Sequence, residues 1–356
     1  MSSLFLHCRP GFEGECAAEI QELAAAHGIS GYCKAKPDTA YVIFQPHEAD
    51  AALRLHRDMR FADLIFIRQW FVVKALCNDL PLTDRVTPLL EQLQDLPAPI
   101  GEIFLETPDT NEGKELSGLC RALERPLQEA LQKAGLRQSS AGQDVVRVNV
   151  CFPSGSAAYV GYALPENSAP WSMGIPRLKF PRGAPSRSTL KLEEAFLHFL
   201  SAGERDLYLQ PGMSAVDLGA APGGWTWQLV KRHLRVTAVD NGALAPVLLD
   251  SGIVEHVRSD GFHYQPPKPV EWMVCDIVEQ PIRIADLAAR WIAHGWCMQT
   301  IFNLKLPMKK RYQEVRRCLM HIDEALRAGG VVYSVACKQL YHDREEVTVY
   351  LRRRTE

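Results

Sequence analysis

Residues 214–224, SAVDLGAAPGG, constrain the fold of this chain more than any other stretch of its sequence. A short apolar run meets Asp217 and then a turn of small residues, and the apolar spacing from Trp225 onward is typical of a helix. Glycine and alanine let a ligand approach such a turn closely, and a helix start offers unpaired backbone N–H groups. The next apolar run ends in Asp240, which follows Gly219 by 21 positions. In dinucleotide-binding folds an acid about 20 residues after the turn reaches a ribose hydroxyl, so the spacing predicts a nucleoside-bearing cofactor at the carboxyl ends of a parallel sheet.

The region 186–356 alternates strand patterns with helix patterns, which predicts a doubly wound, largely parallel α/β sheet. The polar loop 338–344 alone separates the last two strand patterns, so we expect them to form an antiparallel edge hairpin. The arginines at 352–354 are expected to form a disordered tail. Expected strands lie near 214–218, 235–240, 254–258, 271–276, 298–304, 330–337 and 346–351, and expected helices near 191–202, 225–233, 281–293 and 309–327.

The N-terminal half shows short strand patterns between helix patterns. Residues 1–80 predict an α+β, ferredoxin-like subdomain with a mostly antiparallel sheet. In residues 81–165 a strand pattern and a long helix pattern precede two strand patterns joined by a turn. This order resembles the RNA-binding THUMP module, although a plain scaffold domain has almost the same pattern.

A proline-rich linker is expected at 166–185, before a domain at 186–356. Basic residues line this linker with no acid after Glu166 up to residue 188, which suits phosphate contacts but also fits a solvated hinge. A second basic cluster opens the helix pattern near 309, where cations oppose the helix dipole and so indicate either a phosphate partner or a solvated helix face. The candidate RNA-binding residues are Arg177, Lys179, Arg182, Arg187, Lys309, Lys310 and Arg311.

Composition narrows the class of protein. The 356 residues predict about two domains, and a formal net charge of −2 excludes a uniformly basic nucleic-acid binder, so an RNA site must be a local patch. The ten cysteines show no C-x-x-C pair and no zinc spacing, which predicts reduced thiols, a cytoplasmic location and no metal site. The N-terminal residues do not resemble a signal peptide, and no apolar run reaches the roughly 18 residues of a membrane span, so no membrane partner is expected.

Charged residues stand at the ends of several strand patterns. Asp276 follows the strand pattern near 271–276, and Lys305 follows the pattern near 298–304. Ligands of an open α/β sheet bind at the carboxyl ends of its strands, so both side chains are expected to face the crevice beside the glycine turn. Lys191 opens the helix pattern before this turn, and the last strand begins at Glu345 or Glu346.

These segments resemble motifs of one enzyme superfamily. The turn D-x-G-x-x-P-G-G at 217–224 is similar to the cofactor motif of S-adenosylmethionine-dependent methyltransferases. The runs S-R-S-x-x-K at 186–191, N-L-K-L at 303–306 and R-E-E-V at 344–347, together with Asp276, look like the lysine–aspartate–lysine–glutamate tetrad of FtsJ-type 2′-O-ribose methyltransferases. The linker, the N-terminal half and the FNLKLPMKKR and YHDREEVTV segments resemble one branch closely, the ribosomal RNA large subunit methyltransferase M family.

The resemblance implies a Rossmann-like methyltransferase domain at 186–356 that methylates a cytidine ribose in 23S rRNA with S-adenosyl-L-methionine. A monomer acting on naked or early-assembly RNA is expected. Lys305 is implied as the general base, and we expect Lys191 and partial desolvation to lower its pKa from about 10.4. Asp276 would orient Lys305, and Glu346, or Glu345, would hold Lys191 or the ribose. The implied cofactor-binding residues are Ser188, Asp217, Gly219, Ala221, Pro222, Gly223, Gly224, Asp240, Asp260 and Asp276.

Other classes fit the motifs less well. An amino-directed RNA base methyltransferase usually needs an N/D-P-P-Y/F strand end, whereas this chain has D-I-V-E at 276–279, and no Pro-Cys pair supports a carbon-5 enzyme. A nicotinamide oxidoreductase would need G-x-G-x-x-G, which the turn lacks. A non-catalytic RNA-binding or ribosome assembly factor would have no use for the two lysines and two acids together.

Overall fold

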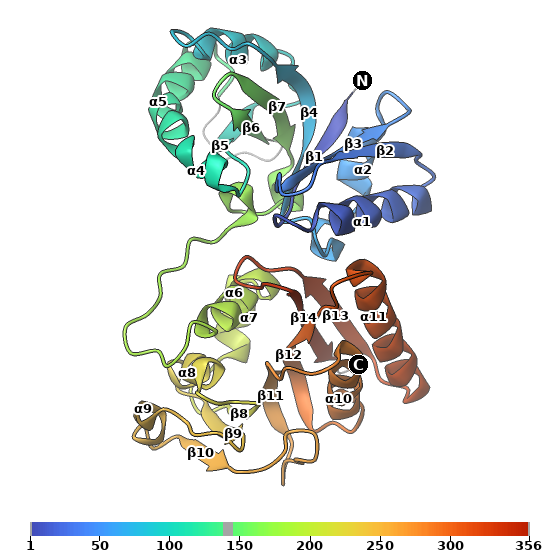
Figure 1. Ribbon diagram of the computed structural model, residues 1–356, viewed down its shortest axis with the longest axis vertical. Helices are drawn as coiled ribbons and strands as arrows, with labels where there is room; N and C mark the ends of the chain where they lie inside the picture. The colour runs from blue at the N-terminus through green and yellow to red at the C-terminus, as the bar shows by residue number, and fades with distance from the viewer. Residues whose placement is uncertain (1, 138–144, 355–356) are drawn as a thin grey trace. The chain divides into compact units, whose positions relative to one another are not determined.

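The computed structural model describes residues 2–137 and 145–354, and it divides into two compact units, Met1–Pro176 and Arg177–Glu356 (Figure 1). Each unit is built around its own β-sheet with helices packed on it. Within the described residues, no helix combines the length and the apolar character that crossing a membrane requires.

The sheet of the N-terminal unit has the strand order β2-β3-β1-β4-β7-β6-β5. Strand β5 pairs with β6 in parallel, and the other neighbours pair antiparallel. The strands are β1 (Ser3–His7), β2 (Gly31–Ala35), β3 (Tyr41–Pro46), β4 (Gln69–Cys77), β5 (Ile100–Glu106), β6 (Val146–Ser154) and β7 (Ala157–Ala163). The helices are α1 (Glu13–Ala26), α2 (Ala51–Asp58), α3 (Val86–Gln92), α4 (Asn111–Glu115) and α5 (Ser117–Lys133).

One continuous sheet joins the two ranges, 1–80 and 81–165, that the sequence pattern predicts as separate domains. Strand β4 belongs to the first part and β7 to the second, yet they pair antiparallel through Val72 with Tyr162 and Val73 with Gly161. This pairing supplies hydrogen-bond partners to an edge of β4 that would otherwise stay open. The ranges 1–80 and 81–165 therefore share one sheet instead of forming two separate ones.

The start of the expected linker also belongs to the N-terminal unit. The Asn167 side chain accepts a hydrogen bond from the Phe61 amide (2.7 Å) and donates to the carbonyls of His56 (2.6 Å) and Met59 (2.7 Å). The Gln69 side chain donates to the Ala169 carbonyl at 2.9 Å. Because these contacts fix residues 166–176 onto the first unit, the connecting segment begins at about Arg177, where the second unit starts.

The sheet of the C-terminal unit has the order β10-β9-β8-β11-β12-β14-β13. Strands β10, β9, β8, β11 and β12 pair in parallel, and β14 pairs antiparallel with both β12 and β13. The strands are β8 (Ser214–Leu218), β9 (Arg235–Val239), β10 (Val254–Val257), β11 (Val270–Cys275), β12 (Cys297–Lys305), β13 (Tyr333–Lys338) and β14 (Glu346–Arg353). The helices are α6 (Thr189–Phe199), α7 (Ala202–Tyr208), α8 (Gly224–Val230), α9 (Pro246–Leu249), α10 (Pro281–Ala293) and α11 (Arg311–Ala328).

This topology confirms the predicted doubly wound sheet with an antiparallel last strand. The predicted antiparallel edge hairpin is also confirmed, because β13 pairs antiparallel with β14, and β13 forms the edge while β14 lies between β12 and β13. The expected disordered tail is wrong, because Arg352 and Arg353 belong to β14, and the Arg352 guanidinium lies 4.2 Å from the centre of the Tyr208 ring.

Apolar residues on one face of this sheet pack against helices α6 and α8. Trp272 and Ile301 from the sheet join Phe196 of α6 and Trp225 and Leu229 of α8 in one buried cluster. The Trp272 and Phe196 rings meet edge to face at 5.6 Å. This packing fixes the start of α6, which carries Lys191, relative to the carboxyl ends of the strands.

The turn between β8 and α8 is held by a buried acid. Gly219 and Gly223 have φ values of +77° and +113°, which glycine adopts without strain. Asp217 is 1% exposed, and its Oδ2 accepts a hydrogen bond from the Thr226 hydroxyl at 2.6 Å. Burial raises the pKa of Asp217 to about 7, with a further contribution from the neighbouring Asp276 and Asp240 carboxylates, although the hydrogen bonds from Thr226 oppose the shift.

We predict that Gly161→Ala destabilises the N-terminal unit by about 1–3 kcal/mol, because a Cβ at this position would overlap the Val72 carbonyl across the β4–β7 pairing. Gly118→Ala, near the start of α5, is the control, since nothing lies within 4 Å of its Cβ position. Urea unfolding of both variants measures the difference. An unchanged stability for Gly161→Ala would contradict the continuous sheet.

We also predict that Asp217→Asn becomes more stable relative to the wild type as the pH rises from about 4 to about 7. In this window the unfolded chain has an ionised Asp217 while the folded chain keeps its proton, so the wild type loses stability with rising pH, by about 1.4 kcal/mol per unit of pKa difference. Urea unfolding at several pH values measures the effect, with the exposed acid Asp250, as Asp250→Asn, for comparison. Parallel pH curves for the wild type and Asp217→Asn would contradict this prediction.

Candidate active site

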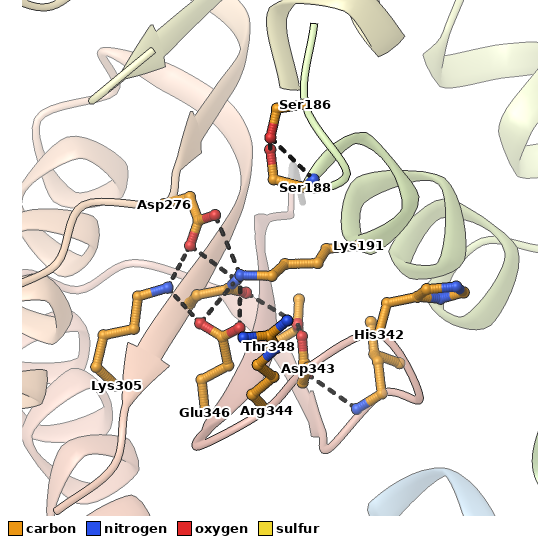
Figure 2. A network of polar contacts seen from close by, with 12 residues as sticks. Ser186, Ser188, Lys191, Asp276, Lys305, His342, Asp343, Arg344, Glu346 and Thr348 are labelled. Atoms are coloured by element: carbon orange, nitrogen blue, oxygen red, sulfur yellow. Dashed lines mark hydrogen bonds and ion pairs between the residues drawn. The ribbon is translucent and has the colours of Figure 1, made fainter. Parts of the chain in front are cut away.

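Two lysines and two carboxylates meet at the carboxyl edge of the C-terminal sheet (Figure 2). The Lys305 ammonium contacts both Asp276 Oδ1 and Glu346 Oε2. The Lys191 ammonium lies 3.3 Å from Asp276 Oδ2 and 2.5 Å from Glu346 Oε1. Each carboxylate therefore bridges the two ammonium groups, and the four predicted catalytic side chains form one cluster.

The strand register explains why these residues meet. Asp276 follows the end of β11, whose Cys275 pairs with Phe302 of β12. Lys305 ends β12 and pairs directly with Glu346, the first residue of the antiparallel strand β14. Lys191 reaches the same point from the first turn of α6.

The cluster is only partly open to solvent. The exposed fraction of the side chain is 21% for Lys305, 18% for Asp276 and 6% for Glu346. Partial burial strengthens the ion pairs relative to those on an open surface, while the exposed part of Lys305 leaves it accessible to a substrate.

The expected lowering of the Lys305 pKa is wrong for the cluster as the structure shows it. Burial alone would lower the pKa of Lys305, but Asp276 and Glu346 outweigh burial, so its pKa is raised above the usual lysine value. Burial opposes ionisation of Glu346, yet Lys305 and Lys191 together lower its pKa. The neighbouring cation and the desolvation favour a lower pKa, but the direct contacts of Lys305 with both carboxylates outweigh them.

The structure also separates Glu345 from Glu346. Glu346 is buried between the two lysines, whereas the Glu345 side chain is 62% exposed and pairs with Arg311 at 2.7 Å. Glu346, not Glu345, therefore belongs to the cluster. Asn303 also contacts it, since its side-chain amide donates to Asp276 Oδ1 at 3.0 Å, a contact to which the sequence assigned no role.

The glycine turn lies directly beside this cluster. A Cβ on Gly219 would overlap the Ile277 side chain, so the turn packs against the residues that follow β11. A Cβ on Gly224 would overlap the Ser188 hydroxyl, which places the start of α6 against the same turn. The predicted turn residues Ala221, Pro222 and Gly223 lie between these two contacts.

Asp240 ties the turn to the end of β9. Its Oδ2 accepts a hydrogen bond from the Ala221 amide at 3.0 Å, and its Oδ1 accepts one from the Gly242 amide at 2.6 Å. Each carboxylate oxygen has a second lone pair, so Asp240 can still accept a hydrogen bond from a ligand hydroxyl. The Asp240 oxygens therefore fit a ribose beside the turn as hydrogen-bond acceptors, and the Asp276 carboxylate lies next to the same turn.

Asp260 lies outside the ion-pair cluster. It follows β10, the outermost strand on that side of the sheet, and its side chain is 52% exposed. Its Oδ1 accepts a hydrogen bond from the Phe262 amide at 2.8 Å, and its Oδ2 lies 3.1 Å from His263 Nδ1. The role of Asp260 in cofactor binding stays a prediction.

The predicted RNA-binding residues divide into two groups. Arg177, Lys179, Arg182 and Arg187 are exposed on the connecting segment and the approach to α6, and Lys309 and Lys310 are exposed before α11. Arg311 differs, because its side chain is 17% exposed and pairs with Glu345. This pair leaves Lys309 and Lys310 as the accessible cations closest in sequence to Lys305.

The arrangement can support transfer of a group to a hydroxyl. A lysine amine can accept a proton once its carboxylate partners hold it less strongly, and two cations can stabilise an oxygen that develops negative charge. Among residues 2–137 and 145–354, no group of three or more histidine, cysteine, aspartate or glutamate side chains could hold a metal ion.

Comparison with family models covers most of the chain. Residues 1–71 match the RlmM ferredoxin-like domain, and residues 84–164 match the N-terminal domain of ribosomal RNA large subunit methyltransferase M. Residues 184–347 match the FtsJ-like methyltransferase model. The ferredoxin-like expectation for the N-terminus and the methyltransferase expectation for the C-terminal unit are confirmed.

Whole-length relatives agree with these matches. The chain is 56% identical over 351 residues to the ribosomal RNA large subunit methyltransferase M of Azotobacter vinelandii, covering 99% of this chain and 98% of that protein. It is 56% identical to the protein of the same name from Stutzerimonas stutzeri (99% and 100% covered) and 55% identical to that from Methylococcus capsulatus (98% and 98% covered). The chain therefore belongs to the ribosomal RNA large subunit methyltransferase M family.

Proposed function

We propose that this protein transfers the methyl group of S-adenosyl-L-methionine to the 2′-hydroxyl of a cytidine ribose in 23S rRNA. The observation that carries the proposal is the cluster of Lys191, Asp276, Lys305 and Glu346 beside the glycine turn. The match to the FtsJ-like methyltransferase model and the names of the relatives, which are methyltransferases of large-subunit rRNA, support it.

The residues around the turn would hold the cofactor. Asp240 would accept hydrogen bonds from the ribose hydroxyls, Ser188 would lie near the methionine end, and the turn 219–224 would cover the nucleoside. Bound there, S-adenosyl-L-methionine supplies an electrophilic methyl group and a positively charged sulfonium. Asp276 is the carboxylate in the cluster that directly follows a strand next to the turn, so it is placed to balance this charge.

Lys305 acts as the general base in this proposal. Its amine would accept the proton of the ribose hydroxyl as the methyl group leaves the sulfonium sulfur, which would keep the electron pair of the broken bond, and joins the ribose oxygen, so no covalent enzyme intermediate is needed. The contacts with Asp276 and Glu346 hold a proton on Lys305. An additional positive charge beside Asp276 weakens this hold and lowers the pKa of Lys305 toward the working pH, so cofactor binding and base activation are coupled.

Lys191 then holds the carboxylates while Lys305 is neutral. It contacts both Asp276 and Glu346, so the two acids keep a cationic partner after Lys305 loses its proton. Without Lys191 two carboxylates would face a neutral amine, and mutual repulsion would make proton loss from Lys305 less favourable. The second lysine therefore has a function separate from that of the base.

The basic residues outside the cluster would bind the RNA backbone. Lys309 and Lys310 follow β12 closely and are exposed, and the strip from Arg177 to Arg187 adds further cations. We place the protein in the cytoplasm as a monomer acting on naked or early-assembly 23S rRNA, and residues 81–165 as a THUMP-like RNA-binding region. These assignments rest on the family and on the charge pattern.

We predict that Lys305→Ala and Lys305→Arg both lower kcat by about 10²- to 10⁴-fold, because neither side chain can accept the proton, while S-adenosyl-L-methionine still binds. Arginine keeps a positive charge between Asp276 and Glu346 but cannot act as a base. Lys305→Arg therefore shows the effect of losing the base without losing the charge. Tritiated-methyl transfer to unmodified 23S rRNA and calorimetry with S-adenosyl-L-methionine measure the two effects. Retained transfer in Lys305→Arg would remove Lys305 from the role of base.

We predict that replacing Lys309 and Lys310 together by alanine raises the KM for RNA with little change in kcat. The slope of the logarithm of the RNA-binding constant against the logarithm of salt concentration should become shallower by about two, because about two fewer counterions are released on binding. Lys268→Ala is the control, because this exposed lysine precedes β11 and so lies at the opposite, amino end of the strands. Filter binding of 23S rRNA at several salt concentrations measures the slope. Equal effects of the control and the double variant would contradict a specific RNA contact.

A further inference from the structure

Asn303 touches both carboxylates of the catalytic cluster. It is fully buried on β12, and its side-chain nitrogen lies 3.0 Å from Asp276 Oδ1 and 3.5 Å from Glu346 Oε2. An amide nitrogen has two hydrogens, so it can donate one to each carboxylate. The opposite orientation would place the amide oxygen against two negative charges, so the orientation of Asn303 matters for the cluster.

Thr348 is placed to fix this orientation. It is the direct cross-strand partner of Asn303 on β14, it is fully buried, and its hydroxyl lies 2.9 Å from Asn303 Oδ1. The same hydroxyl also lies 3.1 Å and 2.9 Å from the two carboxyl oxygens of Asp343. A threonine hydroxyl has a single hydrogen and can donate it to only one of these acceptors.

The protonation of Asp343 decides where this hydrogen goes. An ionised Asp343 carries no hydrogen and would accept the hydrogen bond of the Thr348 hydroxyl. Asn303 Oδ1 would then lack this donor. A protonated Asp343 can donate to the Thr348 oxygen and free the Thr348 hydrogen for Asn303. Its Oδ2 already accepts the Leu340 amide at 2.9 Å, which leaves Oδ1 to carry the proton.

The surroundings of Asp343 favour the protonated form. The residue is completely buried, and burial raises its pKa well above the usual aspartate value. The charged groups that face it are Glu346 and Glu194, which raise the pKa further, and Lys191, which lowers it. Figure 2 shows Asp343 and Thr348 close to Glu346, on the side of the cluster away from Ser188.

We propose that Asp343, Thr348 and Asn303 form a directed hydrogen-bond chain in which each residue donates to the next and Asn303 donates to Asp276 and Glu346. All three are positioning residues, and the inference rests on the proposed methyl transfer. Hydrogen bonds to the two carboxylates stabilise their charged forms and reduce their hold on the Lys305 proton. The chain also fixes both carboxylates at the separation that the two lysines require.

The test compares an isosteric deletion with conservative replacements. Thr348→Val removes the hydroxyl and keeps the shape, and we expect kcat to fall about 100-fold with the KM for RNA and for S-adenosyl-L-methionine nearly unchanged. Thr348→Ser keeps the hydroxyl and should restore most of kcat. Asp343→Asn replaces the acid with an amide that always donates, so its kcat at neutral pH should stay near the wild-type value.

The pH dependence separates positioning from simple packing. In the wild type kcat should rise with pH as Lys305 loses its proton and should fall once Asp343 ionises, whereas Asp343→Asn should lack the fall. Thr348→Val as active as Thr348→Ser, or Asp343→Asn as impaired as Thr348→Val, would overturn the directed chain. Carbon-13 NMR of aspartate-labelled protein gives a readout that does not need RNA. A protonated carboxyl signal at pH 7 that is lost in Asp343→Asn supports the hydrogen-bond chain, even if methyl transfer to 23S rRNA is not observed. An ionised Asp343 signal at pH 7 overturns the chain.

Discussion

Two ammonium groups shared between two carboxylates form the interaction on which the C-terminal unit depends. Isolated buried charges are costly, and here each of the four charges has two partners of opposite sign, which offsets the loss of hydration. The partners come from α6, β12, β14 and the residue that follows β11, so the cluster forms when the strands pair in the observed order. The antiparallel insertion of β14 is essential, because it brings Glu346 opposite Lys305.

The same cluster creates a chemical conflict that the proposed mechanism must resolve. The carboxylates that hold Lys305 in place also hold a proton on it, whereas a base must be neutral when its substrate hydroxyl arrives. Three features act against this hold: the second lysine, the Asn303 amide and the positive charge of the proposed methyl donor. In the proposed mechanism the conflict would also provide control, because Lys305 would become a good base only when the methyl donor is bound.

Much of this arrangement could be predicted from the sequence, and the missing parts have identifiable causes. Asp276 and Lys305 follow apolar strand patterns, and parallel strands bring such residues to one edge, so their meeting followed from the pattern. Strand β2 was not predicted, because its sequence, GYCKA, shows no clear alternation of apolar and polar residues and none of its residues is buried. The continuous N-terminal sheet depends on pairing between segments far apart in the chain. The direction of the Lys305 pKa shift depends on contacts that a sequence cannot supply.

The central claim is that the cluster directs a methyl group to a ribose oxygen. The most direct measurement is to incubate the protein with unmodified 23S rRNA and S-adenosyl-L-methionine tritiated in its methyl group, digest the RNA to nucleosides and separate them. The account predicts that the label elutes with 2′-O-methylcytidine. Label on a base-methylated nucleoside would contradict it.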